Sequence, residues 1–147
     1  MSSRVIVNSI RHTGASVDGI TLDSSGNFST NGSITATGTI TDSKGNIRKI
    51  IISSKSSAYT LVAADAGKAI YISTGGVTVP NAVFSAGDAI TIINNSGSSQ
   101  TITQGASVTM YNTADAATGN RALAGRGIAT MYFVDSSTAY ISGSGLS

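Results

Sequence analysis

Apolar and polar residues alternate with a period of two through most of the chain after residue 57. Alternating runs bounded by Gly, Asn, Asp and Ser predict short β-strands with one buried face. We expect such strands over residues 58–62, 69–74, 76–80, 89–95, 100–104, 107–111, 127–134 and 138–143. Short strands at regular spacing indicate a small antiparallel β-sandwich or barrel.

The inward positions of these strands give the expected core. It consists of large aliphatic and aromatic side chains: Leu61, Ile70, Ile72, Val77, Val79, Val83, Phe84, Ile90, Ile92, Ile102, Val108, Ile128, Met131, Phe133 and Ile141.

The first third of the chain has a sparser apolar pattern. Large side chains recur only every six or seven positions, at Phe28, Ile34, Ile40 and Ile47. Burying one of them contributes ~1.5–3 kcal/mol at best, whereas ordering the backbone costs ~1–2 kcal/mol per residue. We therefore expect an extended β arm that is ordered only against identical copies or a larger partner, with these four residues at the interface.

Three consecutive isoleucines at 50–52 are followed by a Ser- and Lys-rich stretch. This composition predicts a linker. This places the expected boundary between an arm over residues 1–57 and a compact domain over residues 58–147.

Composition supports an all-β fold. The chain has no Cys, Trp or Glu, and charged residues make up 11% of it, so few segments can form a solvated helix. Without cysteine, neither disulfides nor a thiolate metal site contributes to stability. The expected fold class is all-β, an extended N-terminal β arm followed by a small antiparallel β-sandwich or barrel.

Positive charge is concentrated in the arm. The net charge is +2, but residues 1–55 hold six of the nine cations against three aspartates. Arg48 and Lys49 form a basic pair there that favours an acidic protein surface as partner. A nucleic-acid site is disfavoured because no aromatics are interleaved with the cations. No segment is apolar enough over sufficient length to span a membrane.

Candidate catalytic chemistry is limited to His12 and seven aspartates. A triad of His12, Asp18 and a serine lacks the expected nucleophile elbow, and the aspartates form no obvious general acid and base pair. Asp65 and Asp88 lie in turn sequences, where aspartate accepts local backbone hydrogen bonds. We expect no enzyme activity, no catalytic residue and no cofactor.

Two other motifs have both a functional and a structural interpretation. The near-copies "DSSGN" (23–27) and "DSKGN" (42–46) could supply calcium ligands, but each offers one carboxylate, and turn formation is favoured. The glycines of "AGRGIAT" (124–130) lack the lysine of a phosphate-binding loop and favour a bend into the next strand. Arg121 and Arg126 lie in the expected loop over residues 112–126, where they are either solvated or in contact with a partner. We expect no metal site.

Residues 58–145 resemble a β domain found in structural proteins of tailed bacteriophages, notably marine and cyanobacterial ones. The resemblance rests on short motifs: "YTL" (59–61), "DAGK" (65–68), "VTVP" (77–80), "FSAGD" (84–88), "ITQG" (102–105), and "LA" with "RG" at 123–127. Residues 7–29 are also similar to the leading segment of phage virion proteins.

The resemblance implies a non-enzymatic virion protein, assembled in the host cytoplasm as a homotrimer that binds the major capsid protein or other virion proteins. Two placements follow from it. The lack of a long stalk favours a head decoration (cement) protein. The alternative is a short tail fibre or fibre segment whose compact domain meets host surface glycans.

Overall fold

A computed structural model describes residues 9–11, 13–14, 16–17, 19–43, 45–47 and 49–147. Its contacts divide the chain into two units, Met1–Thr39 and Ile40–Ser147. Apart from one 3-10 turn, all regular structure in the described residues is β. The expected all-β class is confirmed.

The first unit is a small antiparallel sheet in the order β1-β2-β3. Its strands are β1 (Ser9–Ile10), β2 (Ile20–Leu22) and β3 (Phe28–Thr30). The "DSSGN" turn joins β2 to β3. There the Asp23 carboxylate accepts the backbone N–H groups of Ser25 and Asn27 at 2.9 and 2.8 Å, and Gly26 takes a φ of +82°, which glycine adopts without strain.

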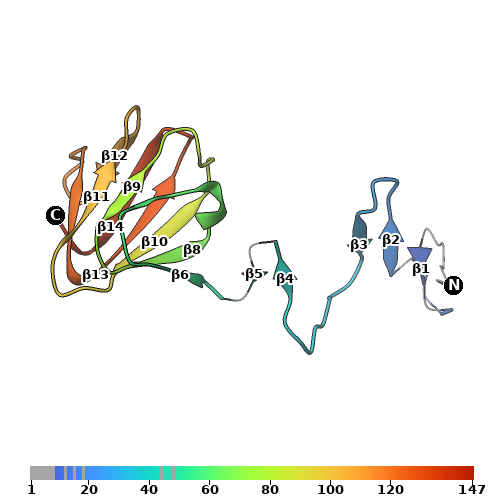
Figure 1. Ribbon diagram of the computed structural model, residues 1–147. Coiled ribbons are helices and arrows are strands. Elements are labelled where there is room, and N and C mark those ends of the chain that lie inside the picture. Colours follow the sequence, from blue (N-terminus) through green and yellow to red (C-terminus); the bar gives the residue numbers. More distant parts are fainter. Residues whose placement is uncertain (1–8, 12, 15, 18, 44, 48) are drawn as a thin grey trace, which may run out of the picture. The chain divides into compact units, whose positions relative to one another are not determined.

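The second unit begins with a hairpin of β4 (Thr41–Asp42) and β5 (Gly45–Asn46). A nine-stranded sheet follows and curves into a nearly closed barrel (Figure 1). Its elements are β6 (Ile51–Lys55), β7 (Tyr59–Thr60), η1 (Ala63–Asp65), β8 (Lys68–Ile72), β9 (Val77–Val79), β10 (Ala89–Asn94), β11 (Gln100–Gln104), β12 (Thr109–Asn112), β13 (Arg121–Phe133) and β14 (Thr138–Leu146).

Successive strands alternate between two halves of this sheet. β6, β8 and β10 pair in parallel in one half, and β7, β9 and β11 do so in the other. The chain therefore winds through three coils, as in a short solenoid. β13 then pairs antiparallel with β10, β11 and β14, and β14 pairs in parallel with β12. Both strand directions are thus present in the barrel.

β13 pairs with strands of both halves because a β-bulge divides it into two parts. Arg121–Leu123 pair with β11 and Ile128–Tyr132 pair with β10, and the register with β14 shifts between Leu123 and Ile128. Gly125 lies in this bulge, where a Cβ atom would come 2.5 Å from the Gly97 carbonyl oxygen. The glycines of "AGRGIAT" therefore allow the strand to bend, as expected from the sequence.

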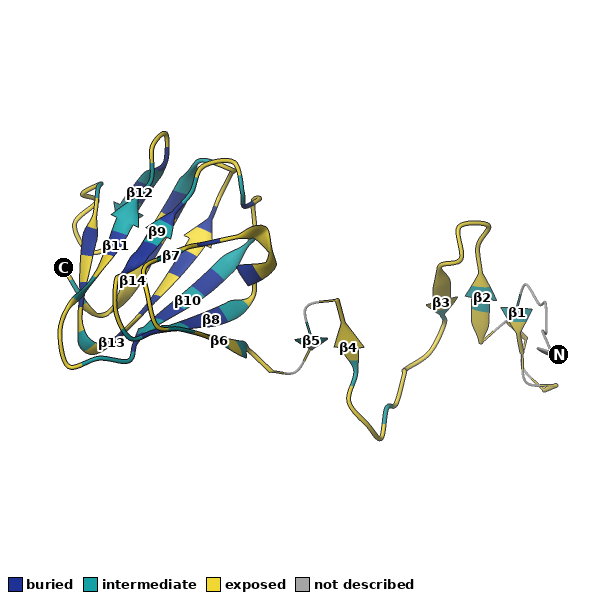
Figure 2. Cartoon of the chain, viewed as in Figure 1, coloured by how far each residue is buried: buried dark blue, intermediate teal, exposed yellow. Residues whose placement is uncertain are grey.

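The barrel interior is a continuous apolar core, shown as dark blue bands in Figure 2. Phe84 and Phe133 stack within it at a centroid distance of 4.5 Å. The expected core is confirmed except at two positions: Val83 is only partly buried, and Ile128 is 45% exposed because it faces outward on β13. Met110 and Leu123 are buried core residues that the sequence analysis did not include.

The junction differs from the sequence expectation. Residues 51–55 form β6, an edge strand paired in parallel with β8, rather than a linker. Contacts divide the chain after Thr39, whereas the boundary expected from the sequence lies between residues 57 and 58. The difference arises because "IISSK" adds its backbone to the larger sheet although only its apolar end resembles a strand.

Candidate interaction surfaces

The predicted interface residues of the arm are exposed or half-buried. Phe28 on β3 is 62% exposed and Ile34 is 63% exposed. Ile40 is half-buried and Ile47 is exposed, and the two are joined by a hydrogen bond from the Ile47 N–H to the Ile40 carbonyl at 3.1 Å. Phe28 and Ile34 belong to the first unit, Ile40 and Ile47 to the second.

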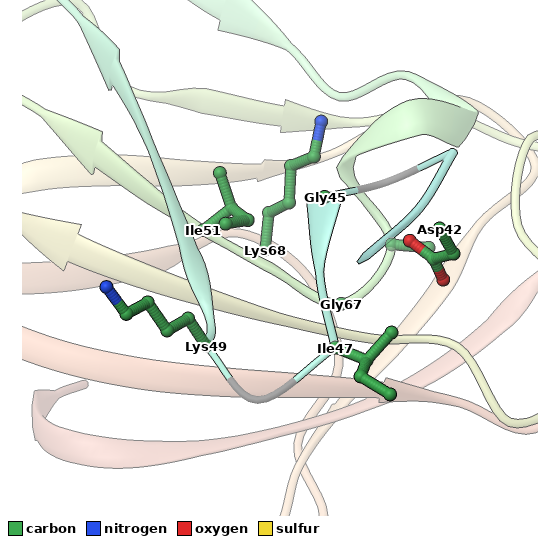
Figure 3. A pocket seen from close by; sticks show the side chains of 8 residues that line it. Asp42, Gly45, Ile47, Lys49, Ile51, Gly67 and Lys68 are labelled. Carbon is green, nitrogen blue, oxygen red and sulfur yellow. The ribbon is translucent and has the colours of Figure 1, made fainter. Parts of the chain in front are cut away.

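The β4–β5 hairpin borders an open groove of about 220 Å³, shown in Figure 3. The hairpin supplies Asp42 and Gly45, and Lys49 and Ile51 follow it. The opposite wall is the turn into β8, with Lys68. Gly45 takes a φ of +120°, and its position is close to the Ile51 side chain.

Two lysines give this groove a positive character. The side chain of Lys49 points away from the Asp42 carboxylate (Figure 3). Lys49 is exposed and Lys68 is half-buried. Arg48, the other half of the predicted basic pair, lies outside the described residues, as does Lys44. The groove can accept an acidic side chain, although solvated lysines of this kind contribute little to binding by themselves.

The turn aspartates carry the local roles expected from the sequence. Asp65 is buried, and its Oδ2 accepts the Val62 N–H at 2.9 Å and the Tyr59 hydroxyl at 2.8 Å. The ring of Tyr59 in turn lies 3.8 Å from the ammonium of Lys55, a cation–π contact. Asp88 accepts the Ser85 N–H at 2.9 Å. These carboxylates stabilise turns.

Local hydrogen bonds also account for the titration of Asp23. The Asn27 side-chain amide donates to its Oδ2 at 2.8 Å, and this bond lowers the pKa of the Asp23 carboxyl, with backbone N–H donors adding to the effect. No group of three or more His, Asp or Glu side chains in the described part of the chain lies close enough to hold a metal ion. The turn interpretation of "DSSGN" is therefore the one that has direct structural support.

The sequence left a solvated and a contacting role open for both arginines; Arg121 is buried rather than solvated, whereas Arg126 is exposed and contacts Asn95. Arg121 opens β13 and is only 9% exposed, because the strand begins earlier than expected and turns this side chain inward. Arg126, in the bulge, donates from Nη1 to the Asn95 side-chain oxygen at 2.8 Å. His12 and Asp18, which the sequence analysis considered as parts of a catalytic triad, lie outside the described residues.

One exposed apolar surface was missed by the sequence analysis. Ile50, Ile52 and Ile128 are 68%, 62% and 45% exposed, and they line one groove on the outside of the barrel. Strands such as "AITII" (89–93) carry isoleucine at both parities, which is the signal that both faces of the sheet are apolar.

The described residues include no helix long and apolar enough to cross a membrane. In the comparisons with known proteins, no family model, no curated protein and no solved structure matches this chain.

Proposed function

We propose that this chain is a non-enzymatic structural protein of a tailed-phage virion, and that it acts as a head decoration (cement) protein. It binds the capsid surface as a symmetric oligomer, a homotrimer, through its N-terminal arm and holds the compact barrel outward. The phage assignment rests on the sequence resemblance of residues 58–145.

One structural contrast supports attachment through the arm. No described residue before Leu61 is buried, whereas the barrel has a continuous core (Figure 2). Phe28 and Ile34 expose apolar area that the arm cannot cover with its own residues. A segment of this kind gains stability when strand edges and apolar side chains meet a partner.

The groove at the β4–β5 hairpin indicates the chemical character of the partner. Lys49 and Lys68 line it beside the β4–β5 hairpin. An acidic strip on a capsid protein would be attracted to these cations, and the attraction would weaken with added salt.

Labelling on the particle tests this proposal. The full chain is fused to a small tag after Ser147 and located by electron microscopy on virions that carry it. Decoration predicts label distributed over the head. Label confined to the tail would contradict decoration, and absence from purified particles would contradict any virion role.

A deletion tests the role of the arm. Removing residues 1–39 should abolish binding to the particle and leave the barrel with an unchanged melting temperature, because the division between the units falls after Thr39. A milder variant separates the apolar contacts from the rest of the segment. Phe28→Ser with Ile34→Ser in the full chain should weaken binding without unfolding the barrel. Undiminished binding of the truncated chain would contradict attachment through the arm.

A second groove favours the alternative, a short tail fibre that contacts host glycans. It has a volume of about 220 Å³ and is lined by Ser54, Lys55, Ser56, Tyr71, Ser73 and Asn95. Hydroxyl and amide groups of this kind can exchange hydrogen bonds with a sugar. Label on the tail, together with loss of cell binding on Ser73→Leu, would establish this alternative.

A further inference from the structure

Among the described residues, the outward positions of β8, β10, β14 and the second part of β13 carry no charged side chain. Buried residues alternate with outward ones in β10, in the second part of β13 and in the first part of β14. In β8, Ala69 is placed on the outward face by its register with Thr91, but it is only 4% exposed. From Ile128 onward in β13, and throughout the other three strands up to Ser144, the outward positions are only Ala, Ser, Thr, Ile and Tyr. A free sheet face usually carries charged side chains toward water.

The outward residues form three rows across the strands. The tyrosine row comprises Tyr111, Tyr140 and Tyr132. The small row comprises Ser142, Thr130, Thr91 and Ala69. The isoleucine row comprises Ile128, Ile93 and Tyr71.

The small row is a trough between two ridges. Its side chains are shorter than those of the tyrosine row on one side and the isoleucine row on the other. A groove of about 320 Å³ lies over Ala69, Thr91 and Thr130, and Ile52, beside Ala69 in the register, closes one end. The ridges are partly exposed: Tyr132 and Tyr140 are 49% and 44% exposed and Ile128 is 45% exposed, whereas Tyr111, Ile93 and Tyr71 are half-buried.

The geometry of a β-sheet makes this relief complementary to itself. Successive rows on one face are two residues apart, or ~6.7 Å, so the trough has the width of one ridge. A copy related by a two-fold axis can place its isoleucine row on this small row and receive the reciprocal contact. Isologous contacts of this kind are the commonest in protein oligomers.

The lack of charge favours a copy of the chain over a charged partner. Two identical charged faces would repel each other, and an uncharged one does not. It also offers no ionic attraction to an acidic or basic partner. Homodimer interfaces are depleted of charge and more apolar than other surfaces.

The reciprocal contact is small. The isoleucine and small rows that face each other across the axis span about four strands at ~4.8 Å and two rows at ~6.7 Å, which gives roughly 260 Å² per copy, or roughly 500 Å² for the pair. An interface of this size is typical of weak, transient association, so we expect the second copy to bind weakly.

We propose that this face is the contact surface for a second copy of the chain, sheet to sheet across a two-fold axis, with the isoleucine row of each copy on the small row of the other. The contact involves only the barrel, so it is separate from attachment through the arm and does not depend on the proposed function.

Sedimentation of the full chain tests the contact. Ile93→Lys with Ile128→Lys places like charges on both faces and should weaken association at least tenfold. The matched control is Thr101→Lys with Ala122→Lys, a cross-strand pair exposed on the other half of the barrel, which should associate as the unmodified chain does. Thermal unfolding of each variant verifies that the barrel is folded.

A charge exchange makes the test specific. The lysine variant mixed with Ile93→Asp and Ile128→Asp should recover association that neither variant shows alone. Every sample contains the same arm, so association through the arm would not produce this difference. The proposal is overturned by an unmodified chain that sediments as a monomer at its solubility limit, by a lysine variant that associates as tightly as the control, or by a mixture without recovery.

Discussion

Asn94 joins the end of β10 to the bulge of β13. It is fully buried, and its side-chain amide donates to the carbonyls of Ser98, Leu123 and Ala124 at 2.8–2.9 Å. Its oxygen accepts from the Ser96 N–H and hydroxyl. A single polar side chain thereby satisfies the carbonyls at the point where β13 leaves one half of the barrel for the other.

Asn94→Ala should lower the free energy of unfolding by about 2–4 kcal/mol, because it leaves buried carbonyls without donors. Asn95→Ala is the control. It removes bonds from the Tyr71 hydroxyl and Arg126 nearer the surface and should cost less than about 1 kcal/mol. Denaturant unfolding measures both, and equal losses would contradict the role assigned to Asn94.

Arg121 is a buried cation whose Nε and Nη2 have no hydrogen-bond partner among the described residues. An unsatisfied buried donor costs about 1–3 kcal/mol, and an apolar residue of similar size removes that cost. Arg121→Met should therefore raise the free energy of unfolding by about 1–3 kcal/mol, while Arg126→Met should not raise it. A loss of stability in Arg121→Met would mean that these donors are satisfied in solution.

Tyr59 is the residue with the clearest shift in titration. Burial raises the pKa of its hydroxyl to about 12, and the hydrogen bond to Asp65 adds to the shift. The unfolded value is about 10, so this group stabilises the fold fully below pH 10 and loses the contribution as the pH rises to 12. Asp65→Asn should lower the pKa of Tyr59 only in part, because burial, the larger cause, remains. NMR titration of the ring carbon, assigned with Tyr59→Phe, measures the change, and an unchanged pKa would contradict the contribution of Asp65.

At the scale of elements, the β13–β14 ladder joins β12 to the rest of the sheet and depends on a close approach at Gly143. A Cβ atom there would overlap with the Ile128 carbonyl and Ala129, both on the facing strand. Gly143→Ala should therefore destabilise the barrel by about 2 kcal/mol or more. Gly97→Ala, where a Cβ meets nothing within 4 Å, should change stability by less than about 1 kcal/mol. Similar melting temperatures for the two would contradict the close approach.

The positions of the eight strands could be predicted from the alternation of apolar residues, as in "QTITQ", which is β11 itself. Their directions could not, because direction depends on which strands become neighbours, and the alternation of β6 to β11 between two halves of the sheet leaves no local signal. β6 was missed because its Ser and Lys residues resemble a linker. Ile128 was assigned to the core because periodicity alone does not tell the inward face from an apolar outward one.

The candidate surfaces were predictable to a similar degree. Exposed apolar residues in the arm could be anticipated from their sparse spacing, since too few of them exist to form a core. The groove at Lys49 could not be anticipated in full, because Lys68 joins it from the turn into β8. The outward isoleucine row depends on registers between β10 and β13, which contacts distant in sequence determine.

At the scale of the whole molecule, the barrel is preceded by a segment in which none of the described residues is buried. The barrel contains the core cluster from Leu61 to Ile141. The first unit has short strands whose apolar side chains, Leu22 and Phe28 among them, are exposed. This arm therefore needs a partner to become ordered, whereas the barrel has a core of its own and folds without one.

Amide hydrogen exchange across the full chain tests this claim most directly. At low concentration and without partners, residues 19–39 should exchange at rates close to those of an unfolded peptide, because few contacts protect them, while β8, β10 and β13 should be protected to the extent of the global stability. Binding to the particle should then slow exchange in residues 19–39. Protection of residues 19–39 equal to that of β10 in the isolated monomer would contradict the account.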